Sequence, residues 1–244
     1  MSPVYLTRAI EAGSVRATYN LAIFWGEAHE GFGPDPARKR ALAEKAIAQG
    51  YLHADNLIGD MFYNGEGVAQ DYAQAVLHYR RAADKGSFIG LRQLGYAYYH
   101  GHGLPEDVRL SAHYLQRAVE AGDKTGIPDL AWLYEGNDGI EQDLLKSYLL
   151  YKRGVEMGDA RAHFELGLFM AYDGYAGFWH DPVKGLGYCQ RGVEMGYDTV
   201  DRTAAADCAE VAEGLSTEDR TAADLFQASL RQDGVNPILR PVSP

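Results

Sequence analysis

Glycine recurs along this chain at a nearly constant interval, and no other feature of the sequence restricts the fold as strongly. Each of these glycines closes a run such as R-A-A-D-K-G, which ends at Gly86. They follow one another at steps of 37, 36, 36, 36 and 38 residues: Gly13, Gly50, Gly86, Gly122, Gly158 and Gly196. Glycine adopts at little cost the left-handed conformation that often follows a helix. A fixed period of this length predicts an all-α solenoid of stacked helical units.

An acidic residue recurs at the same period, just before a second helical run in each unit. The members are Asp35, Asp71, Asp107, Asp143 and Asp181, and Thr217 follows 36 residues after the last of them. A side-chain oxygen at this place can accept a hydrogen bond from the unpaired N–H groups at the start of a helix. A ladder of carboxylates could instead bind cations. The position before a helix explains every member, so we predict helix N-caps.

Two further columns place small residues where helices would approach each other. The first lies four residues before each glycine: Ala9, Ala46, Ala82, Ala118, Gly154 and Gly192. The second pairs an aliphatic residue with a small one in the first helix of each unit: Leu21–Ala22, Ile58–Gly59, Leu94–Gly95, Leu130–Ala131 and Leu166–Gly167. Because small side chains let antiparallel helices pack at roughly 8 Å, the columns predict helix pairs. Leu230 breaks the first column, which predicts a divergent last unit.

The stretch from Ala54 to Gly86 carries all of these columns. It reads A-D-N-L-I-G-D-M-F-Y-N-G-E-G-V-A-Q-D-Y-A-Q-A-V-L-H-Y-R-R-A-A-D-K-G. It resembles the Sel-one-like repeat, a relative of the tetratricopeptide repeats, whose pattern is roughly A-x-x-x-L-G-x-x-Y-x-x-G-x-G-V-x-x-D-x-x-x-A. The resemblance covers roughly residues 5–235. It implies a right-handed superhelix of antiparallel helix pairs and an adaptor or scaffold role, since the family is known for these rather than for one chemistry.

The columns predict a single repeat domain over residues 1–235. A lone helix over residues 1–13 precedes about six repeats of 36–38 residues: 14–50, 51–86, 87–122, 123–158, 159–196 and the divergent 197–234. A divergent last repeat is expected, because a terminal repeat has to cover the end of the core. Residues 236–244 are rich in proline, which predicts an extended tail.

Charge excludes several classes of partner. The chain has 34 acidic and 23 basic residues and a net charge of −11. This argues against nucleic acid and against an anionic membrane surface, since both repel an acidic protein. No run reaches the ~18 apolar residues of a membrane span, so we expect no membrane insertion. The acidic excess would favour a basic partner, although a solubilising surface is the simpler explanation. We expect a monomer.

The two cysteines, Cys189 and Cys208, lie in different repeats. Some secreted members of the family close each repeat with a disulfide, which these two cannot do. Cys189 shares its column with Tyr79, Leu115 and Tyr151, and this favours a buried free thiol. A Cys189–Cys208 disulfide is the alternative.

The N-terminus lacks the basic start and apolar run of a signal peptide, so we expect a cytoplasmic protein, or a periplasmic one if an exported precursor has been trimmed.

No catalytic motif stands out in the sequence, so we expect neither enzyme activity nor a cofactor. His100 and His102 could share a metal, but zinc sites usually need three or four protein ligands and no third is evident. Glu135 and Asp138 read as solvated turn charges rather than as an acid/base pair. A metal-dependent hydrolase remains an alternative that bound metal would reveal.

The candidate binding surface follows from the resemblance, because the first helices line the concave groove of related solenoids. The positions that would face this groove are the third, seventh, tenth and eleventh of the unit that begins at Ala54. Aromatic residues with polar atoms, which interface cores prefer, are frequent there. The candidate groove residues are Asn56, Asp60, Tyr63, Arg92, Tyr96, Tyr99, Trp132, Glu135, Phe164 and Tyr172. Alternatively, the curvature of the superhelix buries some of these rings against the next repeat.

A second candidate contact is the turn of the fifth repeat, which is two residues longer than the others. It carries Tyr175, Phe178 and Trp179 among glycines, and large apolar residues in a loop need cover. These rings either fold back on the solenoid or form a contact site.

Three functions compete. The leading hypothesis is a non-enzymatic scaffold or adaptor that binds a protein or peptide in its concave groove. Some bacterial members of the family neutralise a secreted effector, so an immunity protein is a sharper version of this hypothesis. A cell-wall or carbohydrate binder is the alternative from another class, because aromatic faces stack on sugars, and glycan arrays would distinguish it.

Overall fold

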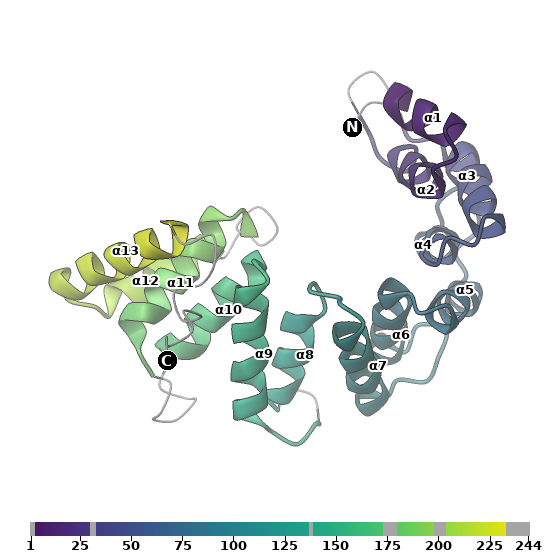
Figure 1. Ribbon diagram of the computed structural model, residues 1–244. Coiled ribbons are helices and arrows are strands. Elements are labelled where there is room, and N and C mark those ends of the chain that lie inside the picture. The colour runs from purple at the N-terminus through teal and green to yellow at the C-terminus, as the bar shows by residue number, and fades with distance from the viewer. Residues whose placement is uncertain (1–2, 30–32, 137–138, 173–179, 198–203, 233–244) are drawn as a thin grey trace, which may run out of the picture. The chain divides into compact units, whose positions relative to one another are not determined.

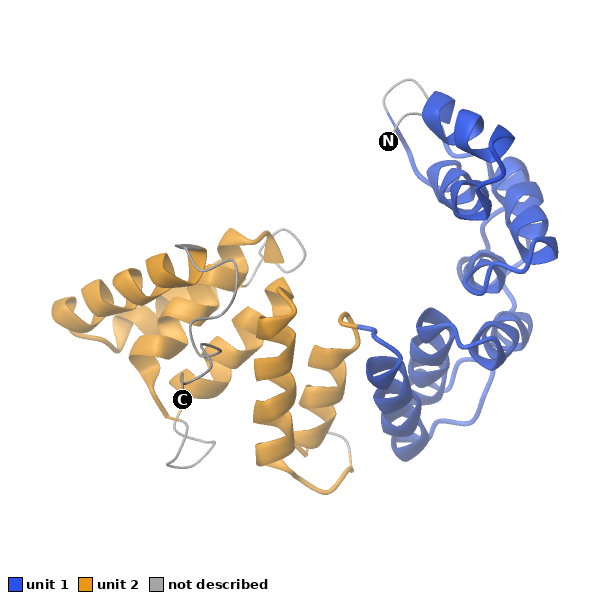
Figure 2. Cartoon of the chain, in the orientation of Figure 1, with its two compact units in different colours: residues 1–123 blue, residues 124–244 orange. Residues whose placement is uncertain are grey.

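The computed structural model describes residues 3–29, 33–136, 139–172, 180–197 and 204–232. Within these ranges the chain forms 13 helices and no strand. The chain has two compact units: unit 1, residues 1–123, and unit 2, residues 124–244 (Figure 2). Unit 1 contains α1 (Pro3–Glu11), α2 (Val15–Phe24), α3 (Pro36–Ala48), α4 (Ala54–Asn64), α5 (Tyr72–Asp84), α6 (Phe88–His100) and α7 (Val108–Glu120). Unit 2 contains α8 (Ile127–Tyr134), α9 (Leu144–Glu156), α10 (Ala160–Ala171), α11 (Pro182–Glu194), α12 (Ala204–Glu213) and α13 (Thr217–Gln232).

Successive helices pack as antiparallel pairs, which confirms the all-α repeat fold. In unit 1, α2 packs on α3, α4 on α5 and α6 on α7 (Figure 1). In unit 2, α8 packs on α9 and α10 on α11. The last two helices depart from this rule, since α12 and α13 both pack on α11. None of the described helices is both long and apolar enough to span a bilayer.

The small-residue columns mark the places where helices come closest, as predicted. At Gly59 of α4, an added Cβ would lie 2.5 Å from the ring of Tyr79, which belongs to α5. At Gly167 of α10, it would lie 2.5 Å from the backbone nitrogen of Cys189, which belongs to α11. A larger residue at either place would force the helices apart, so these glycines determine how the pairs pack.

The aspartate column caps the second helix of each pair, as predicted. The carboxylate of Asp71 accepts a hydrogen bond of 3.0 Å from the backbone N–H of Gln74. Four further members of the column accept the same hydrogen bond from the backbone N–H of the residue three positions later: Asp35, Asp107, Asp143 and Asp181. Each bond satisfies one of the N–H groups that a helix leaves unpaired at its start.

The predicted cap at the sixth member of the column, Thr217, is wrong by one residue. Thr217 is the first residue of α13, and the cap is Ser216, whose Oγ accepts the N–H of Asp219 at 3.1 Å. A step of 36 residues from Asp181 therefore passes the cap by one residue in the last repeat, where the family pattern is weakest.

The glycine column ends helices, as predicted. Gly86 has a φ of +86°, and its N–H donates to the carbonyl oxygen of Ala83 at 2.9 Å. This is the left-handed conformation that residues with a side chain rarely adopt. The other members of the column also have positive φ: Gly13, Gly50, Gly122, Gly158 and Gly196.

The two cysteines form a disulfide, so the expectation of a free thiol at Cys189 is wrong. Cys189 is buried, as its column predicts, but α12 packs against α11 and brings the Cα atom of Cys208 to 5.7 Å. Disulfides commonly span this distance. The column showed that Cys189 is a core position but carried no information on which helix covers it.

Candidate binding surface

The predicted groove residues fall in both units, and each unit is described by itself. Unit 1 holds six of them on α4 and α6: Asn56, Asp60, Tyr63, Arg92, Tyr96 and Tyr99. Unit 2 holds the other four: Trp132, Glu135, Phe164 and Tyr172.

Two of these residues are buried, so their prediction as exposed groove residues is wrong. Asn56 is 1% exposed and Phe164 is 4% exposed. The amide of Asn56 donates to Oγ of Ser87 at 2.9 Å, and the ring of Phe164 lies 4.9 Å from that of Tyr197. Ser87 and Tyr197 each follow the glycine that closes the repeat. The start of the next repeat therefore covers this end of the first helix.

The same contact recurs at the third position in four repeats. Arg92 donates to both carboxylate oxygens of Asp123, at 2.8 and 3.0 Å, and the rings of Tyr19 and Tyr51 lie 4.8 Å apart. The four pairs are Tyr19–Tyr51, Asn56–Ser87, Arg92–Asp123 and Phe164–Tyr197. We infer that the third position joins one repeat to the next, and that Arg92 serves this joint through Asp123.

Asp60, at the seventh position, is a partly buried carboxylate in unit 1. Its Oδ1 accepts hydrogen bonds from the hydroxyl of Tyr79 at 2.8 Å and from Nε2 of Gln93 at 3.0 Å. Burial raises the pKa of Asp60, although these two bonds and the charges of Lys39 and Arg92 oppose the rise. Since desolvation disfavours the ionised form, a cationic group placed beside Asp60 would be stabilising.

Five aromatic rings gather where α4 and α6 end, and we call them the ring cluster: Tyr63, Tyr72, Tyr99, His100 and His102. The rings of Tyr72 and His102 stack with 4.3 Å between centroids and 4° between planes, and His100 lies 5.3 Å from His102. The hydroxyl of Tyr63 lies 2.9 Å from Nδ1 of His102, and the ring of Tyr99 is 4.8 Å from that of His100. His100 is exposed and the other four are partly exposed.

The sequence predicted Tyr63 and Tyr99 in this surface but missed Tyr72 and His102. The cluster forms because the turn of the third repeat packs on the start of α5. At Gly103 in that turn, an added Cβ would lie 2.5 Å from the carbonyl oxygen of Tyr72. The paired glycines around His102 were the available signal. The two histidines contribute to ring stacking, and no group of three potential metal ligands occurs in the described part of the chain.

In unit 2 one arginine pairs with two carboxylates, and a third carboxylate accepts a bond from a buried tyrosine. The guanidinium of Arg161 donates to Asp129 at 2.5 Å and to Glu165 at 3.3 Å, while Glu135 accepts a bond of 2.7 Å from the hydroxyl of Tyr151. Burial raises the pKa of Glu165, and burial together with the charge of Glu135 raises that of Tyr151. The named groups of this cluster thus comprise three carboxylates and one guanidinium.

The remaining predicted residues are divided between the described and undescribed parts. Trp132 is partly buried, and Tyr172 is 41% exposed at the end of α10. The three rings of the second candidate contact, Tyr175, Phe178 and Trp179, lie outside the described residues. That contact therefore stays a prediction.

Capped helix pairs that repeat in phase define a helical repeat protein. Five segments of the chain match the Sel1 repeat: residues 15–51, 52–87, 89–123, 129–159 and 160–197. The matches cover more than half of the sequence, so the chain belongs to the Sel1 repeat family. This scaffold fold is typical of protein–protein interaction, and the family is generally non-catalytic. The predicted sixth repeat lies beyond the last matched segment.

Solved structures with the same fold come from several bacteria. A protective antigen of uropathogenic Escherichia coli strains is 25% identical with a TM-score of 0.68, over 94% of this chain and 49% of that one. The chain thus spans about half the length of that protein. A Sel1 repeat protein of Oxalobacter formigenes is 23% identical with a TM-score of 0.71, over 90% and 88%. An immunity protein of Pseudomonas aeruginosa is 17% identical with a TM-score of 0.56, over 94% and 89%. No curated protein sequence matches the chain.

Proposed function

We propose that the chain is a non-enzymatic scaffold that binds a protein or peptide on the first-helix face of unit 1. The ring cluster is the observation that carries this proposal. Rings that serve the core, such as Tyr79, are fully buried, whereas all five rings of the cluster keep part of their surface accessible. Aromatic residues that also carry a polar atom are enriched at protein interfaces, where they combine large contact area with hydrogen bonding.

The charge of the surface favours a basic partner. Asp60 lies one turn before Tyr63 on α4. Burial disfavours the ionised form of its carboxylate and so raises its pKa. A lysine or arginine of a partner placed beside it would offset that cost. The net charge of −11 would also attract a basic protein over longer distances.

An immunity protein is the second candidate, in which the bound partner is a basic effector. It is supported by the likeness in fold to immunity proteins of Pseudomonas aeruginosa, one at 17% identity and another at 19%. At this level the likeness concerns the fold, so the candidate needs its own test. Co-expression with an effector encoded beside the chain should restore growth that the effector alone prevents, and failure to do so would remove this candidate.

Capture from an extract of the source organism tests the proposal. The immobilised chain should retain a protein that is lost when Tyr99→Ala and His100→Ala are combined in the ring cluster. Leu77→Ala is the matched control, because Leu77 is 46% exposed on α5, the second helix of its pair. Equal retention by the wild type and by this double variant, the ring variant, would contradict the proposal.

A further inference from the structure

The helix α12 lacks the large apolar residues that anchor the first helices of earlier pairs. Its sequence A-A-A-D-C-A-E-V-A-E buries Ala204, Cys208 and Val211, whereas α6 buries Leu91 and Leu94 at the corresponding interface. The stabilisation gained from burial grows with the apolar area removed from water, so alanine contributes little. Packing alone therefore holds α12 more weakly than the other first helices.

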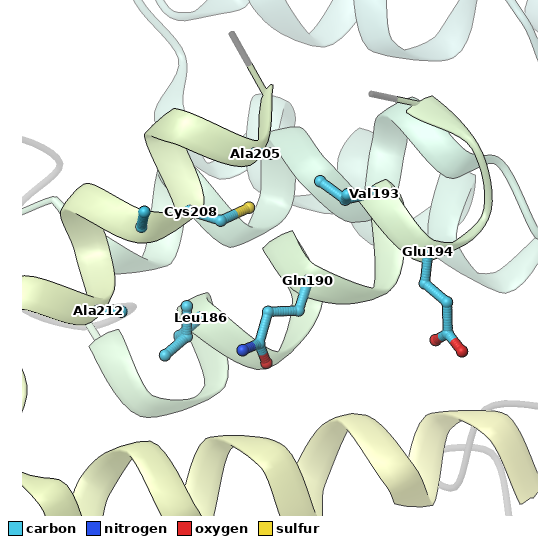
Figure 3. Close-up of a pocket in the computed structure, with 8 residues that line it drawn as sticks. Leu186, Gln190, Val193, Glu194, Ala205, Cys208 and Ala212 are labelled. Atoms are coloured by element: carbon cyan, nitrogen blue, oxygen red, sulfur yellow. The ribbon is translucent and has the colours of Figure 1, made fainter. Parts of the chain in front are cut away.

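A groove lies between α12 and α11, where α12 lacks large apolar side chains (Figure 3). Its volume is about 370 Å³, and it is lined by Leu186 and Val193 from α11 and by Ala205, Ala209 and Ala212 from α12. The groove is open to solvent along one side. The alanines of α12 are too short to fill the space in front of α11.

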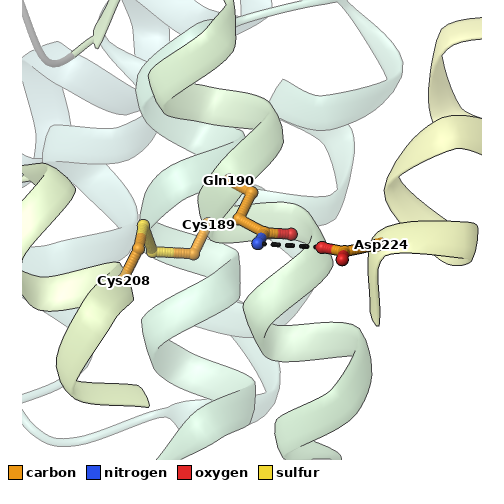
Figure 4. The surroundings of a disulfide bond; sticks show 4 residues. All are labelled: Cys189, Gln190, Cys208 and Asp224. Carbon is orange, nitrogen blue, oxygen red and sulfur yellow. Dashed lines mark hydrogen bonds between the residues drawn. A yellow bond between two sulfur atoms is a disulfide. The ribbon is translucent and has the colours of Figure 1, made fainter. Parts of the chain in front are cut away.

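The Cys189–Cys208 disulfide crosses from α11 to α12 beside this groove (Figure 4). Cys208 is one of the residues that line the groove, and Cys189 is fully buried beneath it. The bond joins residues 19 apart in the sequence, which restricts the unfolded chain and favours the docked helix. Another neighbour of α11 is held differently, since Gln190 donates to Asp224 of α13 at 3.2 Å.

We propose that this disulfide is a redox lock that keeps α12 docked on α11, and that the protein works in a compartment where disulfides persist. Its formation takes two protons and two electrons from the thiols of Cys189 and Cys208. An external disulfide accepts them by thiol–disulfide exchange and is reduced to two thiols. Reducing compartments keep such pairs as thiols. The lock therefore favours an oxidising compartment over a reducing one such as the cytosol.

Thiol titration with hydrogen exchange tests the lock. The purified protein should show no free thiol before reduction and two after it, since it has two cysteines. Reduction should speed amide exchange in α12 at least about tenfold and lower the melting temperature by roughly 5–10 °C, while exchange in α4 and α6 stays unchanged. Unchanged protection of α12 after reduction would overturn the lock.

The double variant Cys189→Ala with Cys208→Ala controls for other effects of the reductant. It should match the reduced wild type in α12 exchange and should not respond to reductant. A double variant whose α12 is as protected as in the oxidised wild type would also overturn the lock. The compartment is tested by alkylating intact cells before lysis: a blocked pair that reacts only after reduction supports the proposal, and two alkylated thiols would refute it.

Discussion

At the scale of single residues, Asp60 shows how one partly buried carboxyl makes stability depend on pH. Its Oδ1 is satisfied by Tyr79 and Gln93, but burial still raises its pKa above the ordinary value of 3.8. A carboxyl whose pKa is higher in the folded state binds protons more tightly there than in the unfolded chain. Its contribution to stability is therefore full below pH 3.8 and is lost as the pH rises through the folded value.

Asp60→Asn should remove this dependence on pH. The asparagine Oδ1 can accept the same two hydrogen bonds and carries no charge to desolvate. We expect the variant to be at least as stable as the wild type near pH 7, and the difference between them to shrink as the pH falls toward about 4. Urea unfolding across this range measures it. A variant clearly less stable than the wild type near pH 7 would show that the charge itself stabilises the fold.

Gly167 shows how closely α10 and α11 approach. An added Cβ would meet the backbone nitrogen of Cys189 at 2.5 Å and the carbonyl oxygen of Gly185 at 2.7 Å, and backbone atoms cannot rotate aside. Gly167→Ala should therefore lower the free energy of unfolding by about 1–3 kcal/mol. Gly214→Ala is the control, because its Cβ would meet nothing closer than 3.6 Å and should change stability by less than about 0.5 kcal/mol. Similar losses at both sites in thermal melts would refute the close approach.

At the scale of the helix, local signals predicted the elements and longer-range contacts decided the exceptions. An N-cap such as Asp71 and a helix stop such as Gly86 act within four residues, so their columns marked the helices correctly. Asn56 and Phe164 were misjudged because their exposure depends on the first residue of the next repeat. The same holds for Tyr72, which joins the ring cluster through a turn that lies about 30 residues further along the chain.

The caps can be tested one helix at a time. Asp107→Ala removes the bond of 2.9 Å to the N–H of Leu110 and should cost about 0.5–2 kcal/mol of stability. Asp84→Ala is the control, since Asp84 is exposed in the last turn of α5, where a negative charge opposes the helix dipole. Chemical denaturation should show a loss for Asp107→Ala alone. Equal stability of the two variants would mean that the aspartate column does not cap.

At the scale of the whole molecule, the repeats separate residues that join neighbours from residues that remain available to a partner. The third position of the first helix is used for the joint in four repeats, so it contributes to stability along the chain. In unit 1 the tenth position, at Tyr63 and Tyr99, keeps its rings partly exposed, although Tyr63 also contacts His102 of the next repeat. Because each repeat of such a protein contacts mainly its neighbours, changes at the ring cluster should leave distant repeats folded.

Calorimetric titration of the captured partner tests the binding surface most directly. The ring variant combines Tyr99→Ala with His100→Ala, and the control combines Leu77→Ala with Leu145→Ala, which are 46% and 55% exposed on the second helices α5 and α9. We predict that the ring variant binds at least about tenfold more weakly than the wild type, with a melting temperature within a few degrees, and that the control binds normally. Wild-type affinity in the ring variant, or a loss confined to the control, would contradict the assignment of the binding surface to the ring cluster.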